Sequence, residues 1–300
     1  MISVVVCTRD RARMLERCLR HMAETCRGAD LAWQLVIVDN ASVDDTRAVA
    51  KQFATVLPLC YVQESRRGLS HARNRGVSVA KHSIIAFTDD DCLVAPDWLR
   101  SIVDEFARHP EASILGGRVE LADPGDHPVS IRRHAREEAI TTIDQIMALL
   151  AGCNMAFRRG VFDDVGRFDT AFGKGKHIGA GEDLDFLYRA LKHGHSIRYS
   201  PDVLVRHAHG RHTADALQTL AHDYLKGRGA FYCKFITDRQ IAQRAYWEFC
   251  GLARQWVRDP LRSGSPRALG SLATGAFYQC VAGTAGTAQG TSHAVPRGGT

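Results

Sequence analysis

Strand-like and helix-like patterns alternate through the first part of the chain, and this alternation constrains the fold more than any other feature. Four apolar, strand-like runs occur at residues 2–7, 34–39, 59–64 and 83–88. After the first run, apolar residues follow the i, i+3, i+4, i+7 spacing of an amphipathic helix, at Leu15, Cys18, Leu19 and Met22. Such alternation is typical of a mostly parallel, doubly wound sheet that helices flank. The sequence therefore predicts an α/β protein.

The later part of the chain is less regular. Further strand-like runs occur at residues 112–121, 151–157 and 203–210. Helical patterns are expected at residues 131–150 and 182–194, and two more helices within 213–258. From Ser263 onward small residues dominate, which predicts a partly loose tail that could include a helix over 269–281.

Charge and cysteine usage narrow the class of partner and the compartment. The net charge of +6 fits nucleic acid, an anionic membrane face or a phosphate-bearing substrate. Nucleic acid is the weakest of the three, because no basic run carries interleaved aromatic residues. The nine cysteines include no C-x-x-C pair, so they suggest neither a zinc site nor a disulfide framework. We expect a cytoplasmic protein, and no segment has the length and apolarity of a spanning helix.

Polar side chains follow three of the predicted strands. Thr8 and Arg9 follow the first, Asp39 ends the second, and Asp89 begins a run of three aspartates after the fourth. Ligands of parallel α/β sheets bind at the carboxyl ends of the strands. Adjacent carboxylates repel one another unless a cation shares them, and hard oxygen ligands select Mg²⁺ or Mn²⁺. The alternative interpretation is a polar loop that caps the next helix.

The sequence lacks the motifs of several other classes of nucleotide-binding protein. The first strand is followed by Thr8-Arg9-Asp10-Arg11 and not by the glycine-rich turn of a dinucleotide fold, and no Walker A sequence is present. A sugar nucleotidyltransferase stays open as an alternative, although the glycine-rich N-terminal loop of that class is absent.

Six motifs, in order, resemble the family 2 glycosyltransferases, which adopt the GT-A fold. The stretches are VVVCTRDR (4–11), VIVDNASVDDT (36–46), RGLSHARNRG (67–76), FTDDDCLVAPDWL (87–99), GCNMAFRR (152–159) and GEDLDFLYRAL (181–191). The resemblance covers about residues 2–210. It implies an inverting, metal-assisted enzyme that moves a sugar from a nucleotide diphosphate donor, with UDP favoured, to a hydroxyl acceptor.

The resemblance also implies a nucleotide-binding set. Thr8 and Arg9 match the positions that cradle the base, and Asp39 matches the carboxylate that accepts a hydrogen bond from uracil. Arg73 matches a basic contact to ribose or diphosphate, and the alternative for it is a solvated helix arginine. The family commonly has tyrosine and asparagine after the threonine, where this chain has Arg9 and Asp10. That difference puts the base-stacking contact in doubt.

The aspartate run matches the family's D-x-D motif. Asp89 corresponds to the acid near the ribose and Asp91 to the acid on the metal, Mn²⁺ or Mg²⁺. Asp90 gives the motif a second spacing, so we place Asp89 and Asp90 on the nucleotide and Asp89 and Asp91 on the metal. The resemblance also implies His207 as a third metal ligand, because some GT-A enzymes place a metal-binding histidine at about this distance after the Glu-Asp helix, and alternation puts His207 on the buried face of its strand. The alternative for it is a structural histidine, buried or on the surface. His209 continues that face and competes for the role.

Glu182 and Asp183 match the Glu-Asp pair in which the aspartate is the general base. Acidic residues are also common in a first helical turn, because the helix dipole favours them there. The glycine-punctuated loop over 174–181 suits a mobile lid on the acceptor side and favours catalysis. A catalytically silent sugar-nucleotide or glycan-binding module is the second interpretation. It predicts loss of Asp183 or of the aspartate run, and both are present.

The expected domains follow from the extent of the resemblance. Residues 1–210 form the GT-A catalytic domain, with a nucleotide-binding half (1–110) and an acceptor half (111–210). Residues 211–262 are a helical extension, and 263–300 are the small-residue tail. The extension is rich in arginine and aromatic residues, so it either covers the catalytic domain, which we favour, or makes a peripheral contact with an anionic membrane face.

Overall fold

The computed structural model describes residues 1–26, 30–258 and 267–276. The chain divides into two compact units, which are described separately. Unit 1 comprises Met1–Thr170 and Glu182–Leu217, and unit 2 comprises Ala171–Gly181 and the chain from Gln218. The loop that precedes Glu182 therefore belongs to unit 2, whereas the sequence places it inside the catalytic domain.

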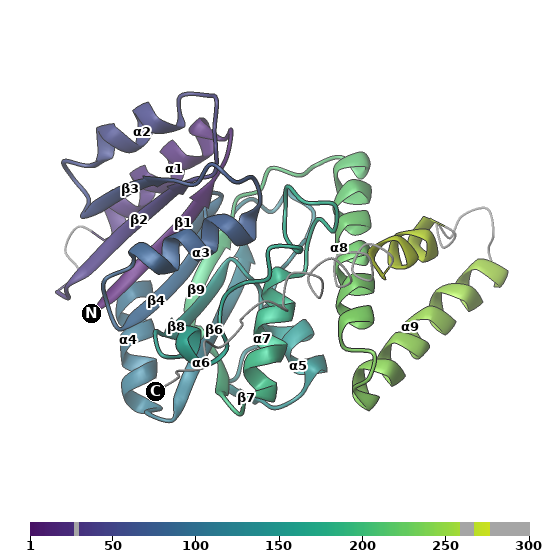
Figure 1. Cartoon of the computed structure of the whole chain (residues 1–300). Coiled ribbons are helices and arrows are strands. Elements are labelled where there is room, and N and C mark those ends of the chain that lie inside the picture. The colour runs from purple at the N-terminus through teal and green to yellow at the C-terminus, as the bar shows by residue number, and fades with distance from the viewer. Residues whose placement is uncertain (27–29, 259–266, 277–300) are drawn as a thin grey trace, which may run out of the picture. The chain divides into compact units, whose positions relative to one another are not determined.

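Unit 1 is built on a nine-stranded sheet (Figure 1). Its order is β3-β2-β1-β4-β8-β6-β9-β5, and β7 pairs with β9. The strands are β1 (Ile2–Thr8), β2 (Trp33–Asp39), β3 (Leu59–Gln63), β4 (Ile84–Asp89), β5 (Cys92–Val94), β6 (Ala112–Leu121), β7 (Glu138–Ile140), β8 (Asn154–Arg158) and β9 (Ser196–His207).

The sheet is parallel in its first half and mixed in its second. Strands β1, β2, β3 and β4 pair in parallel, as their helical crossovers require. Strand β8 runs antiparallel to both β4 and β6, and β9 runs parallel to β6 but antiparallel to β5 and β7. The α/β class is confirmed, and the structure adds these antiparallel pairings.

Helices cover both faces of the sheet. They are α1 (Ala12–Thr25), α2 (Thr46–Phe53), α3 (Leu69–Val79), α4 (Trp98–Arg108), α5 (Ile143–Leu149), α6 (Val161–Asp164) and α7 (Glu182–Lys192). Leu19 of α1 and Trp98 of α4 share a buried cluster with Val4 and Val6 of β1. Val5 points to the opposite face and lies under α3, where a Cβ at Gly76 would come within 2.3 Å of it. Glycine at this position allows α3 to approach the sheet closely.

The helix expected over residues 131–150 is present only in its last part, as α5 (Ile143–Leu149). Glu138–Ile140 forms β7, which pairs with β9, and the helix begins only after Thr142. Thr142 and Gln145 form a reciprocal capping box, which fixes the start of α5. The strand expected at 151–157 also begins later, at Asn154.

Unit 2 is helical. It contains most of α8 (Ala214–Lys234), α9 (Arg239–Arg258) and a helical stretch at 267–276, so two helices over 213–258 are confirmed. Lys174 of the loop pairs with Asp223 of α8 at 3.0 Å. Part of the tail helix expected over 269–281, and most of the tail, lie outside the described residues.

The outer surface of α9 is aromatic in part. Tyr246, Trp247 and Phe249 are 61%, 55% and 57% exposed. Within the described residues, no helix combines the length and the apolarity needed to cross a bilayer. Contact of this helix with an anionic membrane stays a prediction.

Candidate active site

The strand register gathers the predicted polar residues at one edge of the sheet. Thr8 at the end of β1 is paired with Asp39 at the end of β2, and its neighbour Cys7 is paired with Asp89 of β4. His207 ends β9 opposite Cys92, which follows the aspartate run. The expected convergence of strand ends is therefore confirmed, because parallel neighbours finish at the same edge.

Asp90 and Asp91 are buried, and one arginine binds both of them. The guanidinium of Arg11 lies 2.8 Å from Asp90 Oδ1 and 2.7 Å from Asp91 Oδ2. Thr8 Oγ1 donates a hydrogen bond of 2.6 Å to Asp90 Oδ2. Asp90 thus has protein partners on both oxygens, whereas Arg11 holds only one oxygen of Asp91.

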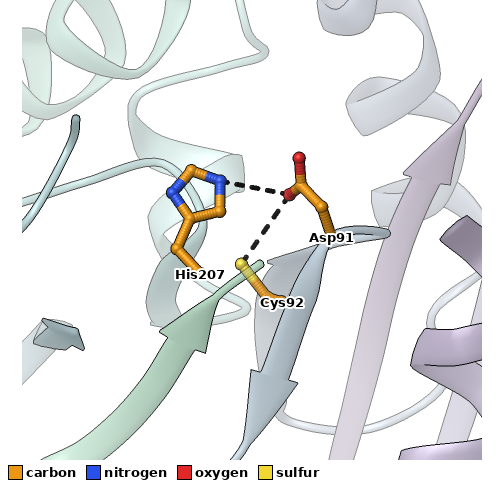
Figure 2. A group of neighbouring side chains, drawn as sticks. All are labelled: Asp91, Cys92 and His207. Carbon is orange, nitrogen blue, oxygen red and sulfur yellow. Dashed lines mark hydrogen bonds and ion pairs between the residues drawn. The ribbon is translucent and has the colours of Figure 1, made fainter. Parts of the chain in front are cut away.

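The second oxygen of Asp91 faces His207. Nε2 of His207 lies 3.2 Å from Asp91 Oδ1, and both side chains are almost fully buried. Figure 2 shows His207 and Cys92 directed at this same oxygen. Ligand atoms of Asp91, Cys92 and His207 all lie within 4.8 Å of one another, and Asp89 is not part of this group.

Burial and pairing give the three aspartates different pKa values. Burial raises the pKa of Asp90 to about 7, although the charge of Arg11 opposes the shift. Burial also raises the pKa of Asp89. For Asp91 burial acts in the same direction, but the hydrogen bond and charge of His207 and the charge of Arg11 outweigh it and hold the pKa well below its usual range. Asp91 is therefore the aspartate of the run whose surroundings most favour the charged form.

A divalent cation fits the chemistry of this group. A carboxylate oxygen and an imidazole nitrogen 3.2 Å apart are suitable ligands for Mn²⁺ or Mg²⁺ and leave positions for phosphate oxygens. Nδ1 of His207 is buried and has no hydrogen-bond partner among the described residues. His209, the competing candidate, is engaged elsewhere: Nε2 lies 3.1 Å from the His127 carbonyl, and Nδ1 accepts the backbone N–H of Arg211.

The predicted catalytic pair lies at the start of α7, where its two members have different environments. Glu182 is buried and accepts a 2.7 Å hydrogen bond from Arg73 Nη1, while Asp183 is only partly buried. The backbone N–H of Gly152 donates to Asp183 Oδ2 at 3.1 Å, and the Gly152 carbonyl accepts from Arg73 Nη2 at 3.2 Å. The backbone of Gly152 thus links the candidate base to the buried ion pair.

Arg73 is not the solvated arginine of the alternative interpretation. Its guanidinium lies 5.8 Å and 5.5 Å from the ring centres of Phe87 and Phe168, in cation–π range. Burial by itself would lower the pKa of Arg73, but the carboxylates of Glu182, Asp89 and Asp183 outweigh it and raise the pKa. Burial also raises the pKa of Glu182 to about 7, against the effect of Arg73.

Asp39 is held by two donors that the sequence does not reveal. The backbone N–H of Ser42 donates to Oδ1 at 2.8 Å, and the Tyr61 hydroxyl donates to Oδ2 at 2.5 Å. Each carboxylate oxygen keeps a second lone pair for a ligand. Arg9 is partly exposed and contacts Asp10 at 3.2 Å.

Three residues of this site were missed by sequence reasoning: Arg11, Asn40 and Tyr61. The amide of Asn40 donates to the carbonyls of Glu64 and Arg66 and accepts the N–H of Gly68, so it fixes the loop that leads into α3. The position of Asn40 directly after Asp39 was the only available signal. For Arg11 and Tyr61 no local pattern exists, because their partners lie 80 and 22 residues away.

Comparison with known proteins gives a consistent result. The family model described as Glycosyl transferase family 2 matches residues 3–166. Glycosyltransferase AglE of Haloferax volcanii is 25% identical over 83% of this chain and 80% of its own length. The glucosyl-dolichyl phosphate glucuronosyltransferase of the same organism is 26% identical over 69% of this chain and 68% of its own.

Solved structures resemble this chain in fold. S. aureus TarS 1-349 in complex with UDP-GlcNAc has a TM-score of 0.62 at 17% identity, over 92% of this chain and 81% of that chain. Mannosyltransferase PcManGT from Pyrobaculum calidifontis, in complex with GDP-Man and Mn²⁺, has a TM-score of 0.61 at 20% identity, over 96% and 81%. The expected GT-A fold is thereby confirmed.

Proposed function

Since this chain belongs to glycosyl transferase family 2, we propose that it is an inverting enzyme with a nucleotide diphosphate sugar as donor and a hydroxyl group as acceptor. A UDP-sugar is the favoured donor, and the complex of TarS with UDP-GlcNAc supports this choice. The nucleotide half of the proposed domain is 1–110 and the acceptor half is 111–210.

One observation carries the proposal. The guanidinium of Arg73 donates a 2.7 Å hydrogen bond to Glu182 of α7 and lies 5.8 Å from the ring centre of Phe87 in β4, the strand that ends at Asp89. Gly152 joins the same guanidinium to Asp183, because its carbonyl accepts from Arg73 and its N–H donates to Asp183. The candidate donor side and the candidate base therefore belong to one site, as group transfer between a donor and an acceptor requires.

The nucleotide would bind at the ends of β1, β2 and β4. Asp39 is fixed by Ser42 and Tyr61, and its free lone pairs suit an N–H of the base. Thr8 and Arg9 lie at the neighbouring strand end, and Asp89 and Asp90 continue that edge toward the ribose and diphosphate. The buried ion pair of Arg73 with Glu182 gives this arginine a positioning role, in place of the direct contact to the nucleotide that the resemblance implies.

Asp91 and His207 would hold Mn²⁺ or Mg²⁺, whereas Asp89 lies outside the group of ligand atoms that contains them. The complex of PcManGT with Mn²⁺ supports this cofactor class. When bound, such an ion offsets the charge that develops on the leaving diphosphate. Arg11 holds the far oxygen of Asp91 at 2.7 Å, so the near oxygen stays directed at His207.

Asp183 would take the proton of the acceptor hydroxyl. Its Oδ2 is oriented by Gly152 N–H and its Oδ1 by Leu184 N–H, and the carboxylate stays partly exposed, as contact with an acceptor needs. Glu182 is buried, and its ion pair with Arg73 fixes the start of α7. Attack from the side of a single base, opposite the leaving group, leads to inversion.

A screen of sugar nucleotides tests the proposal. The protein is incubated with UDP-, GDP- and dTDP-sugars, and release of the nucleoside diphosphate is measured with Mn²⁺, with Mg²⁺ and with excess EDTA. We expect slow metal-dependent release from one UDP-sugar without any acceptor. Full release in EDTA would refute the metal role, and an absence of both binding and release across the donors would refute the transferase.

The variant Asp183→Asn tests whether Asp183 acts as the general base or only as a binding residue. It keeps the size of the side chain and removes its basicity, so turnover should fall by about a hundredfold or more while donor affinity is kept. Asp163→Asn, an exposed first-turn aspartate of α6, is the matched control. If turnover of Asp183→Asn stays within a fewfold of the wild type, another residue is the base.

A further inference from the structure

Asp91, Cys92 and His207 form a compact group of three different ligand types (Figure 2). All three are buried, with residue exposures of 6%, 0% and 6%. The thiol of Cys92 is 4.0 Å from Asp91 Oδ1, the same oxygen that lies 3.2 Å from His207 Nε2. Asp91 directly precedes β5, Cys92 begins it and His207 lies at the end of β9, and the antiparallel pairing of these two strands brings them together.

We propose that this group is a binding site for a thiophilic divalent cation of the zinc class, and that such an ion competes with the Mn²⁺ or Mg²⁺ used in transfer. This inference rests on the proposed assignment of Asp91 and His207 as metal ligands. Its new element is Cys92, which an oxygen-seeking ion would not use.

The ligand spacing suits a tetrahedral ion. Zinc bonds of about 2.1 Å to oxygen, 2.05 Å to nitrogen and 2.3 Å to sulfur imply an oxygen–nitrogen separation of roughly 3.4 Å and an oxygen–sulfur separation of roughly 3.6 Å. The corresponding separations here are 3.2 Å and 4.0 Å. Shifts of a few tenths of an ångström in the side chains would bring these two separations to the values of a zinc site.

The charge of Arg11 already orients one of the ligands. Arg11 binds Asp91 Oδ2 at 2.7 Å, which leaves Oδ1 as the free oxygen toward Cys92 and His207. Partners of this kind fix the direction of a metal ligand. Nδ1 of His207 is buried without a hydrogen-bond partner in the described part of the chain. The imidazole packs against the ring of His209, and its polar contact in this group is made through Nε2.

Ligand softness separates the two classes of ion. Thiolates favour zinc and cadmium, whereas Mg²⁺ and Mn²⁺ prefer oxygen and, for Mn²⁺, imidazole. A thiophilic ion would take Cys92 as a thiolate, and the thiol proton would pass to solvent. Three protein ligands in place of two leave fewer positions for diphosphate oxygens. The ion would thus occupy the site without supporting the reaction.

The test uses the full-length protein in a thiol-free reductant. Bound Mn²⁺ is measured by the loss of its free EPR signal, and Cd²⁺ is then added while the sulfur-to-cadmium charge-transfer absorption is recorded. We expect one Cd²⁺ to displace one Mn²⁺ with the appearance of this absorption. In Cys92→Ser the absorption should be lost and the Cd²⁺ affinity should fall at least about tenfold, the loss that an outer partner alone produces.

Two comparisons control for the other thiols and for folding. Cys60→Ser alters a partly exposed cysteine of β3 and should behave as the wild type. Retained Mn²⁺ binding by Cys92→Ser shows that the site is intact. Equal displacement by Cd²⁺ in Cys92→Ser and the wild type, with Mn²⁺ bound by both, overturns this inference alone. A wild-type protein that does not bind Mn²⁺ overturns the assignment of the metal ligands as well.

Discussion

The buried ion pair between Arg73 and Glu182 allows the size of a perturbation to be worked out. The two side chains are 3% and 7% exposed and 2.7 Å apart. Arg73→Met removes the guanidinium and keeps an unbranched side chain, so an unpaired carboxylate is left in the interior. Loss of one partner of a buried pair costs about 3–5 kcal/mol. We expect the free energy of unfolding to fall by about this amount when Glu182 is ionised.

The loss of stability caused by Arg73→Met should be larger at high pH than at low pH. Burial raises the pKa of Glu182 from 4.5 to about 7. A carboxyl group with a raised pKa contributes stability that is fully present below its unfolded pKa of 4.5 and lost as the pH rises through 7. Without Arg73 the pKa rises further, so the ionised form is penalised more. The deficit of Arg73→Met should therefore grow as the pH passes upward through about 7.

Chemical denaturation followed by circular dichroism, at one pH well below and one well above 7, measures this deficit. Arg75→Met is the matched control, because Arg75 is exposed on the same helix and should change stability by less than about 0.5 kcal/mol. Adding Glu182→Gln to Arg73→Met should recover part of the loss at high pH. A deficit below about 1 kcal/mol at high pH, the size expected of an exposed pair, would refute the reasoning. An equal deficit at both pH values would refute it too.

Two further variants test the contacts of the site. Arg11→Gln removes the ion pairs of Asp90 and Asp91 with this arginine, while Asp91 keeps His207 as a partner. The loss should cost about 1–3 kcal/mol, less than for a fully buried pair, because Arg11 is 36% exposed. Thermal unfolding should show that Mn²⁺ stabilises this variant more than the wild type, while the exposed control Arg13→Gln should resemble the wild type. In Gly152→Ala a Cβ would lie 2.8 Å from both Arg73 Nη2 and Asp183 Oδ2. The displaced base should lower kcat about tenfold or more and leave the donor KM little changed. Gly160→Ala is the control, because a Cβ there meets nothing within 4 Å. An unmoved melting temperature in Arg11→Gln, or equal kcat in the two alanine variants, would contradict these expectations.

The sequence determined the framework of unit 1 because the framework depends on local patterns. Apolar runs and helical spacing located β1 to β4 to within about one residue at each end. Parallel connectivity then required the strand ends to meet, and Thr8, Asp39 and Asp89 do lie in neighbouring positions of the register. Six ordered motifs were enough to predict the family.

Local patterns failed where pairing with a distant segment decided the structure. Residues 138–140 read as helical in isolation, yet they form β7 because the edge of β9 is available to them. The start of α5 depends on the capping box of Thr142 and Gln145, whose signal is only two residues long.

The chemistry of the candidate site was decided by tertiary structure. The sequence named Asp91, His207, Glu182 and Asp183, but it could not place Arg11 on the aspartates, Tyr61 on Asp39 or Cys92 beside His207. The absence of a C-x-x-C pair gave no hint of a thiol among metal ligands. Ionic and hydrogen-bonding energies depend on separations of a few ångströms and on burial, and both arise only when segments far apart in the chain pack together. The sequence by itself therefore determined which side chains reach this edge of the sheet, and the packing decided which of them are charged, paired or free to bind.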